Sequence, residues 1–290
     1  MRMSYKILYA NGCSHTEGQE LGNERFNYFK LTGEHRSTRK KLKKLGALEH
    51  LQWMEDHAWP KIFANELNIP TVQNAATSGS SNKKIVRNTI HDVTQLLKQY
   101  SADEILVAIG WSGFTRHEII QDDEWCQVVY PSSKTRSAHI TERHCRKYVS
   151  VREDVMVYQL PVYMNEYFKD VFALKAFLKS VGVSYVFTSC VFERVKDTWD
   201  NDLIELTIGM DELRTMFEIS VMGDFIEYVH PYFPKVDDPY RDLIQWGEFR
   251  GLSAFLLDKK YPVGVGFHPL EEGQEAWGKY LAEEFLKRKI

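Results

Sequence analysis

A serine stands just past a short apolar run near the start of the chain. The run contains Ile7 and Leu8 and breaks on Asn11 and Gly12, which is typical of a buried strand that ends in turn residues. Ser14 follows directly. In open parallel sheets, ligands bind at the carboxyl ends of the strands, where main-chain N–H groups can stabilise an anion. Ser14 is therefore a candidate nucleophile; the alternative is an ordinary turn in which Ser14 caps a helix.

Small and polar residues also follow the next two predicted strands. Gly79 stands between a strand at 70–76 and a helix that begins near Asn82, so its main-chain N–H can point at a ligand oxygen. Ser112 follows the clearest strand, 102–110, which is a continuous apolar run that ends on glycine. Both loops are expected at the same edge of the sheet as Ser14.

The last loop of the chain carries a histidine. His268 precedes Pro269, which suits the start of a helix that runs to about Lys287. A histidine in this position is a candidate base, and the alternative is a histidine that only caps the helix or packs against it. If this helix covers the sheet, His268 is expected near the edge of the sheet at which the strands have their carboxyl ends.

Strands alternate with helices in the remaining pattern, which indicates a parallel sheet covered on both faces. Expected helices lie at about 59–68, 82–100 and 166–181, and a fourth strand lies at 183–190. One domain spanning residues 1–290 is the simplest organisation. Its expected insertions are a polar segment at about 17–58, an irregular one at about 117–164, and short helices and loops at about 191–262. The last of these could form a lid or only a satellite core.

Composition restricts the class of protein. The 290 residues are 43% hydrophobic, which is enough for a sizeable core. The formal net charge of -3 gives no general attraction to nucleic acid or to an anionic membrane. We see no secretory signal, no span of apolar residues long enough for a bilayer, and too few cysteines for a disulfide framework. The expected location is the cytoplasm.

The loop residues occur in an order that resembles the SGNH (GDSL-type) hydrolase family. The sequence that flanks them is similar to that of SGNH-like proteins encoded by bacteriophages. The resemblance covers roughly residues 5–16, 58–116 and 264–286. Four segments carry it: Gly12–Thr16 (Gly-Cys-Ser-His-Thr), Asn74–Asn82, Ile109–Gly113 and Gly266–Pro269. Together they are more specific than any one alone.

The resemblance implies a three-layer α/β/α, flavodoxin-like parallel sheet and an ester hydrolase that needs no metal and no cofactor. Ser14 would be the nucleophile and His268 the general base of a Ser-His dyad. Gly79, with Ser112 or Asn82, would hold the oxyanion.

Two positions depart from the pattern of the family. The asparagine of the third segment, normally an oxyanion donor, is replaced by Ser112, whose hydroxyl is shorter. The aspartate expected three residues before His268 is replaced by Val265. A triad carboxylate fixes the tautomer of the imidazole and stabilises the imidazolium. A main-chain carbonyl, or an acid from elsewhere in the chain, would have to take its place.

Other polar residues allow two interpretations each. His15 could touch substrate or pack against the loop, and Arg116 could bind a substrate anion or form a surface salt bridge. The basic run 36–44 could bind phosphate or form the solvated face of a helix. A zinc site is a weaker possibility, because only two of its four candidate ligands are close in sequence. Those candidates are Cys126, His139, His144 and Cys145.

Two hypotheses follow. The chain is either an esterase, lipase-like enzyme or carbohydrate O-deacetylase, or a catalytically degenerate SGNH-like binding or structural protein of a phage. The first predicts a small-molecule or carbohydrate ester as substrate, with neither nucleic acid nor membrane as partner, in the host cytoplasm if a phage encodes it. The oligomeric state does not follow from the sequence.

Overall fold

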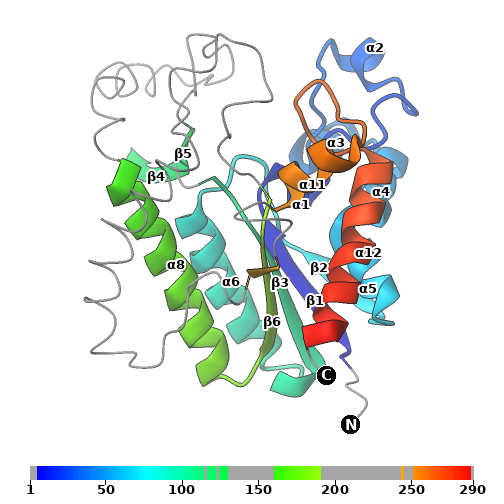
Figure 1. The fold of residues 1–290 in the computed structure, drawn as a ribbon. Helices are drawn as coiled ribbons and strands as arrows, with labels where there is room; N and C mark the ends of the chain where they lie inside the picture. The colour runs from blue at the N-terminus through cyan, green and yellow to red at the C-terminus, as the bar shows by residue number, and fades with distance from the viewer. Residues whose placement is uncertain are drawn as a thin grey trace.

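A parallel β-sheet forms the centre of the protein in a computed structural model that describes residues 5–113, 116–121, 124–129, 160–190, 243–244 and 251–288 (Figure 1). All its neighbouring strands are parallel. The strands in sheet order are β2 (Thr71–Asn74), β1 (Ile7–Gly12), β3 (Ile105–Trp111), β6 (Ser184–Ser189) and β7 (Leu243–Ile244). In chain order this is 2-1-3-4-5, the flavodoxin-like order, so the predicted α/β fold is confirmed.

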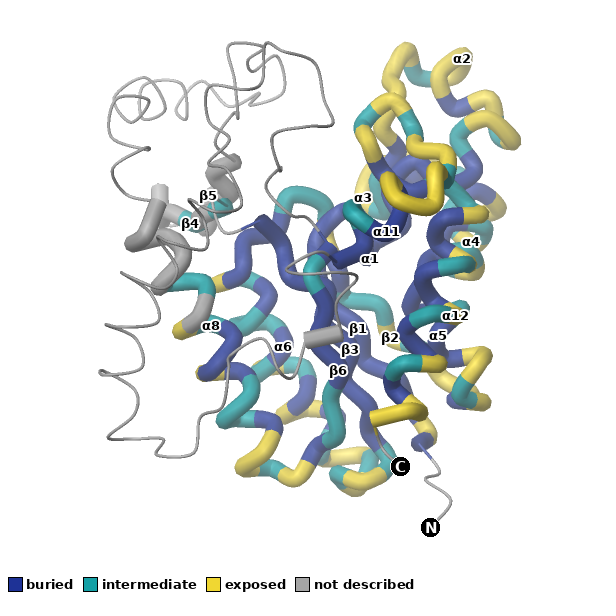
Figure 2. Tube along the Cα trace, viewed as in Figure 1, coloured by how far each residue is buried: buried dark blue, intermediate teal, exposed yellow. Residues whose placement is uncertain are grey.

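Helices cover both faces of the sheet (Figure 1). On one face lie α6 (Asn82–Leu96) and α8 (Leu160–Ser180); on the other lie α5 (Trp59–Glu66), α11 (Leu252–Lys259) and α12 (Glu271–Arg288). Successive strand residues point to opposite faces. Leu8 therefore belongs to the core under α5 and α12, whereas Tyr9 belongs to the core under α6 and α8. The strands are buried throughout the centre of the sheet (Figure 2).

The first strand runs further than its sequence indicates. Asn11 and Gly12 were expected to break it, but both belong to β1 and pair with β3. The amide of Asn11 is 2% exposed, donates to the hydroxyls of Tyr9 and Thr89 and to the carbonyl of Ile85, and accepts from the N–H of Gly12. A buried asparagine with these partners is compatible with a strand, because its polar groups are satisfied.

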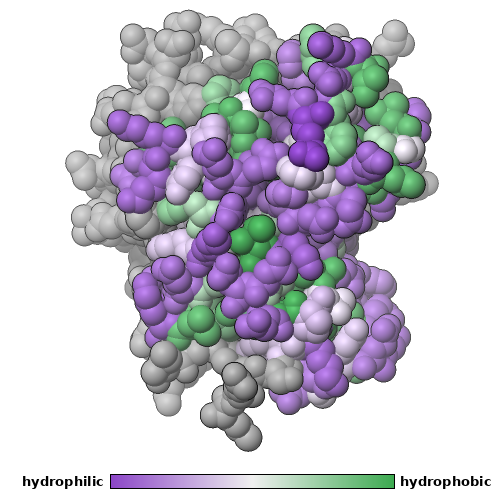
Figure 3. Space-filling view, turned by 90° about the vertical axis from the view of Figure 1, so that its right-hand side faces the viewer, coloured by the Kyte–Doolittle hydropathy of each residue, from purple (hydrophilic) through white to green (hydrophobic). Residues whose placement is uncertain are grey.

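The expected insertion at 17–58 is helical. It contains α2 (Tyr28–Thr32), α3 (Arg39–Leu45) and α4 (Leu48–His57), and it follows a single turn, α1 (Ser14–Glu17). These helices share a small core of their own, formed by Leu21, Tyr28, Leu42, Met54 and Ala58. The side of the molecule on which α4, α5 and α12 lie is mostly hydrophilic, with separate apolar patches (Figure 3).

The segment 117–164 was expected to be irregular, and this was wrong for the parts that the structure describes. An antiparallel pair, β4 (Arg116–Gln121) and β5 (Glu124–Val129), stands apart from the main sheet, and α8 begins at Leu160. Charged residues hid the strand pattern. The side chain of Glu118 is 1% exposed and pairs with Arg87 on α6 at 2.6 Å. A charged residue therefore occupies a buried strand position, where an apolar residue is expected. Of the segment 191–262, only β7 and the stretch from residue 251 onwards, with α11, lie within the described ranges.

No helix in the described ranges is both long enough and apolar enough to cross a membrane.

The carboxyl end of β1 has no room for a side chain at residue 12, because Gly12 pairs with Gly110 and the Thr16 hydroxyl lies over both. A Cβ atom on Gly12 would lie 2.7 Å from the carbonyl oxygen of Gly110 and would also meet Thr16 Oγ1. We expect Gly12→Ala to lower the free energy of unfolding by about 1–2 kcal/mol, the usual cost of overpacking. Urea denaturation measures this; an unchanged midpoint would contradict the close approach.

Candidate functional site

Ser14 begins the helical turn α1 directly after β1. Its neighbour Cys13 is extended, and the N–H groups of Thr16 and Glu17 donate to the Cys13 carbonyl at 3.0 and 2.9 Å. The first N–H groups of a helix have no partner within it, so the Ser14 N–H is available to an anion. The order of the sheet reverses between β1 and β3, and ligands bind at such a switch point. Ser14 is 3% exposed and lies at this edge.

Gly79 lies in the loop between β2 and α6, in the left-handed conformation with φ of +80°. A Cβ built on it would meet nothing within 4 Å, so the backbone borders open space there. The loop is tied to the end of β1, because the N–H of Thr77 donates to the carbonyl of Gly12 at 3.2 Å. The Gly79 loop and the Ser14 turn therefore meet at one edge of the sheet.

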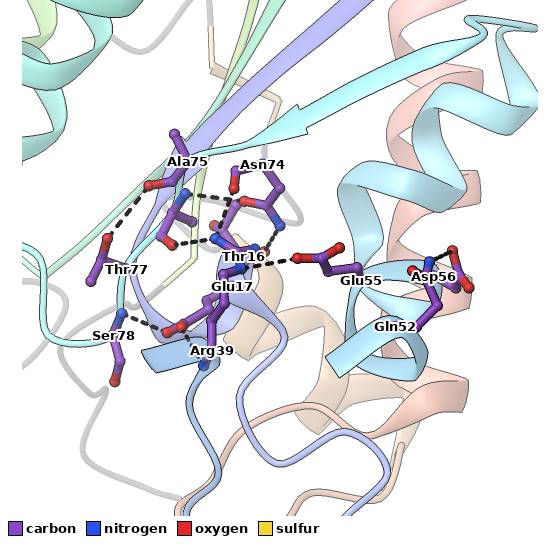
Figure 4. A network of polar contacts seen from close by, with 11 residues as sticks. Thr16, Glu17, Arg39, Gln52, Glu55, Asp56, Asn74, Ala75, Thr77 and Ser78 are labelled. Atoms are coloured by element: carbon purple, nitrogen blue, oxygen red, sulfur yellow. Dashed lines mark hydrogen bonds and ion pairs between the residues drawn. The ribbon is translucent and has the colours of Figure 1, made fainter. Parts of the chain in front are cut away.

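A partly buried polar network braces the Gly79 loop from the side of the insertion (Figure 4). Glu17 accepts hydrogen bonds from the N–H of Ser78 at 2.6 Å and from the N–H of Arg39 at 2.9 Å. The guanidinium of Arg39 donates to the carbonyls of Asn74 and Ala76. Burial raises the pKa of Glu17, and the hydrogen bond from Arg39 opposes that rise. Arg39 thus joins the Gly79 loop and is not simply part of a solvated helix face.

We expect Arg39→Met to lower the free energy of unfolding by about 1–2 kcal/mol. The change removes charged hydrogen bonds to the carbonyls of Asn74 and Ala76 and takes a cation away from buried Glu17. Chemical denaturation measures the loss. Lys40→Met, an exposed neighbour on α3, is the matched control. Equal midpoints for the two variants would contradict the network.

The side chain of Asn82 is hydrogen-bonded to the backbone of Ser112. The amide oxygen of Asn82 accepts from the N–H of Ser112 at 2.9 Å, and its amide nitrogen lies 3.1 and 3.4 Å from the carbonyls of Ser112 and Gly113. The amide of Asn82 is thus engaged in holding the loop after β3. The hydroxyl of Ser112 is buried and has no hydrogen-bond partner within the described part of the chain. Of the two residues, Ser112 is the one with a donor to spare for an oxyanion.

The loop before α12 brings His268 to the same edge. The ring of His268 lies 5.1 Å, between centroids, from the ring of His15, the neighbour of Ser14. Gln274 on α12 is fully buried; it donates to the His15 carbonyl at 3.0 Å and accepts from the N–H of Trp59 at 2.8 Å. The start of α12 is thereby fixed against the Ser14 turn.

A carboxylate lies beside His268. Oε2 of Glu20 is 3.4 Å from Nδ1 of His268, and both side chains are buried. Burial lowers the pKa of His268 to about 4, although the contact with Glu20 acts in the opposite direction. His268 is therefore neutral at pH 7 and able to accept a proton. Val265, which stands in place of the expected aspartate, is 69% exposed and offers no carboxylate.

His15 and Arg116 border the Ser14 turn in different ways. His15 is 8% exposed, and its Nδ1 lies 3.8 Å from the sulfur of Cys13. Burial tends to raise the pKa of Cys13, but His15 and the charge of Arg116 outweigh it and lower that pKa to about 6. Cys13 and Cys190 are both free and fully buried. Arg116 begins β4, and its Nη1 has no hydrogen-bond partner among the residues described.

The described residues contain no group of three or more histidine, cysteine or acidic side chains that could hold a metal ion. Of the four candidate zinc ligands, Cys126 lies in β5 without a described side chain, and His139, His144 and Cys145 lie outside the described residues.

Glu20, Glu17, Arg39 and Gln274 complete the arrangement, and sequence patterns did not single them out for a role at the site. The first three lie in a polar segment where charges are expected on the surface. The one sequence feature that relates to Glu20 lies far from it along the chain. Gly264 and Gly266 lack side chains at the point where the Glu20 carboxylate packs.

Comparisons with known proteins give a family and likenesses to solved structures. "Family of unknown function (DUF6071)" matches residues 43–203. A member of the lipolytic protein G-D-S-L family from Veillonella parvula DSM 2008 is 13% identical, with 97% of this chain and 98% of that chain covered and a TM-score of 0.39. Phospholipase A1 from Streptomyces albidoflavus NA297 is 12% identical, with 97% and 99% covered and a TM-score of 0.33. No curated protein matches the chain.

Proposed function

The chain belongs to this family of unknown function, and we propose that it is a serine hydrolase that cleaves a carboxylic ester through Ser14 and His268. The observation that carries the proposal is the meeting of three groups at one edge of the sheet. Ser14 follows β1, and the neutral, buried imidazole of His268 lies beside the ring of His15, which is next to Ser14 in the chain. The backbone of Gly79, which borders open space, lies in the adjoining loop.

The proposed reaction is acyl transfer to water. His268 takes the hydroxyl proton of Ser14 while the oxygen attacks the ester carbonyl, and the alcohol leaves with the proton that His268 returns. Water activated by the same imidazole then hydrolyses the acyl-serine. Each step leaves His268 neutral again, so the cycle needs no other reactant.

The oxyanion would be held by backbone and hydroxyl donors. The N–H groups of Ser14 and Gly79 would supply two, and the hydroxyl of Ser112, which has no hydrogen-bond partner among the described residues, would supply the third. Asn82 supports this arrangement indirectly by holding the backbone of Ser112. A serine hydroxyl in place of an asparagine amide favours a slower enzyme, because each oxyanion donor is typically worth roughly 100-fold or more in rate.

The substrate class that fits is an ester of a small molecule or of a carbohydrate. Arg116, with an unpartnered Nη1 within the described part of the chain, would favour an acyl or alcohol group that carries negative charge. We place the enzyme in the cytoplasm, in the host if a phage encodes the chain. The rival proposal is a binding or structural protein that has kept this fold without activity.

The test is a screen for ester hydrolysis. Purified protein would be incubated with short-chain p-nitrophenyl esters and with acetylated sugars, some of them anionic, and Ser14→Ala protein would serve as the blank. Turnover by the unmodified protein above this blank is the expected result. A well-folded protein that matches its blank on every ester would favour the binding or structural alternative.

A further inference from the structure

Glu20 presents its carboxylate to the nitrogen of His268 that the proposed base does not use. The distance between Glu20 Oε2 and His268 Nδ1 is 3.4 Å, and the two side chains are 2% and 8% exposed. Within the described residues, Nδ1 has no hydrogen-bond partner. The contact is longer than a strong hydrogen bond, as contacts of catalytic groups often are before substrate binds. Glu20 is therefore the acceptor toward which an Nδ1 proton can point.

The loop that carries His268 is built around this carboxylate. The N–H of Gly266 donates to both oxygens of Glu20, at 2.9 and 3.1 Å. A Cβ on Gly266 would lie 2.5 Å from Glu20 Oε1 and 2.8 Å from His268 Nδ1, and a Cβ on Gly264 would also meet the carboxylate. Glycines at these two positions thus let the loop close onto Glu20. Arg36, with its Nε 4.0 Å from Oε1, adds a positive charge on the outer side.

The backbone supports the same conclusion. Glu20 adopts a left-handed conformation with φ of +76°, and Phe267, next to His268, does so with φ of +61°. Such conformations cost a residue that is not glycine roughly 1–2 kcal/mol, and they concentrate at functional sites. One member of the contact, Glu20, and the residue that precedes the other member, Phe267, are thus both held in this conformation.

We propose that Glu20 is the positioning residue that replaces the missing aspartate and completes a Ser14–His268–Glu20 triad; the inference rests on the proposed hydrolase function. A carboxylate only accepts hydrogen bonds, so it holds the proton of the neutral imidazole on Nδ1. The lone pair of Nε2 is then free for the hydroxyl of Ser14. When His268 takes that proton, the negative charge of Glu20 stabilises the imidazolium.

The charges around His268 set the direction of its pH dependence. Burial lowers the pKa of the ring, the contact with Glu20 raises it, and the electrostatic effects of His15 and Arg36 lower it. Removal of the Glu20 charge should therefore move the acid limb of activity to lower pH. A merely structural role of Glu20 would not move that limb.

Glu20→Gln, which is nearly isosteric, tests the proposal by two readouts. The first is the rate at which a fluorophosphonate probe labels Ser14 across pH 3 to 8, a range that includes the pKa of His268. We expect that rate to fall on the order of 100-fold, with its acid limb moved to lower pH, and Glu20→Asp to recover part of the rate. The second is nitrogen-15 NMR of His268 at pH 7, with the proton on Nδ1 in the unmodified protein and divided between the nitrogens in Glu20→Gln.

The matched control is Glu271→Gln. Glu271 also ties the insertion to α12, through the N–H of Gly22 and the indole of Trp53, but among the described residues it forms no hydrogen bond or ion pair with His268. Its variant should label at the rate of the unmodified protein. Normal labelling and an unchanged tautomer in Glu20→Gln would overturn the role of Glu20 and leave the hydrolase standing. An unmodified protein that is never labelled would overturn both.

Discussion

Replacing Ser14 with alanine or His268 with glutamine is expected to lower kcat/KM for the best ester found by on the order of 10⁴-fold or more. Alanine removes the oxygen that attacks, and glutamine cannot take its proton. Because the two residues act as a unit, the double variant should be no slower than either single one. Steady-state kinetics on the three variants measure this.

The control for these losses is His15→Gln. His15 lies beside both residues, with its ring 5.1 Å from that of His268, yet it is directed at the sulfur of Cys13. Its variant should keep activity within about 10-fold of the unmodified protein, well short of the loss expected for either member of the pair. A His15→Gln variant that is as inactive as His268→Gln would show that the base had been assigned to the wrong histidine.

Stability is expected to fall by about 3 kcal/mol as the pH drops from 6.5 to 4, because of His268 alone. Burial lowers the pKa of this residue from 6.5 to about 4 in the folded protein. Between those values the unfolded chain binds a proton that the folded chain does not, so acid favours unfolding. Above pH 6.5 the full stability is present. Urea denaturation between pH 7.5 and 4.5 measures the slope.

His268→Gln isolates this contribution, because glutamine does not titrate. His50, whose pKa is also lowered by burial, remains in both proteins and contributes a slope of the same sign to each. The difference between the two stability curves should therefore grow toward acid pH within the window from 6.5 to 4. Parallel curves would contradict a neutral, buried His268.

Much of the fold could be predicted because its elements carry local signals. The continuous apolar run of β3 and the helical spacing of α6 are properties of short segments, and both elements lie close to where they were expected. The pair β4 and β5 was missed because Glu118, a charged residue, is buried by a partner on another element. Asn11 was interpreted as a turn residue for a similar reason, since two of the partners that satisfy its buried amide lie on α6.

The residues of the candidate site also differ in whether a local sequence signal indicates them. Ser14, Gly79 and His268 each stand at the end of a strand or the start of a helix, where position in sequence indicates position at the sheet edge. Glu20 does not stand at such a position. Its proposed role depends on a contact with His268, 248 positions away, and on a loop with two glycines. A polar segment rich in charge gives no sign of which carboxylate turns inward.

The most direct test of the central claim is to treat the folded protein with a fluorophosphonate and locate the adduct by peptide mass spectrometry. The probe reacts with an activated serine and requires no knowledge of the substrate. We predict one adduct per chain, on Ser14, that is absent from Ser14→Ala and strongly reduced in His268→Gln. An adduct on another residue, or no adduct on folded protein, would contradict the claim that this edge of the sheet holds a catalytic serine.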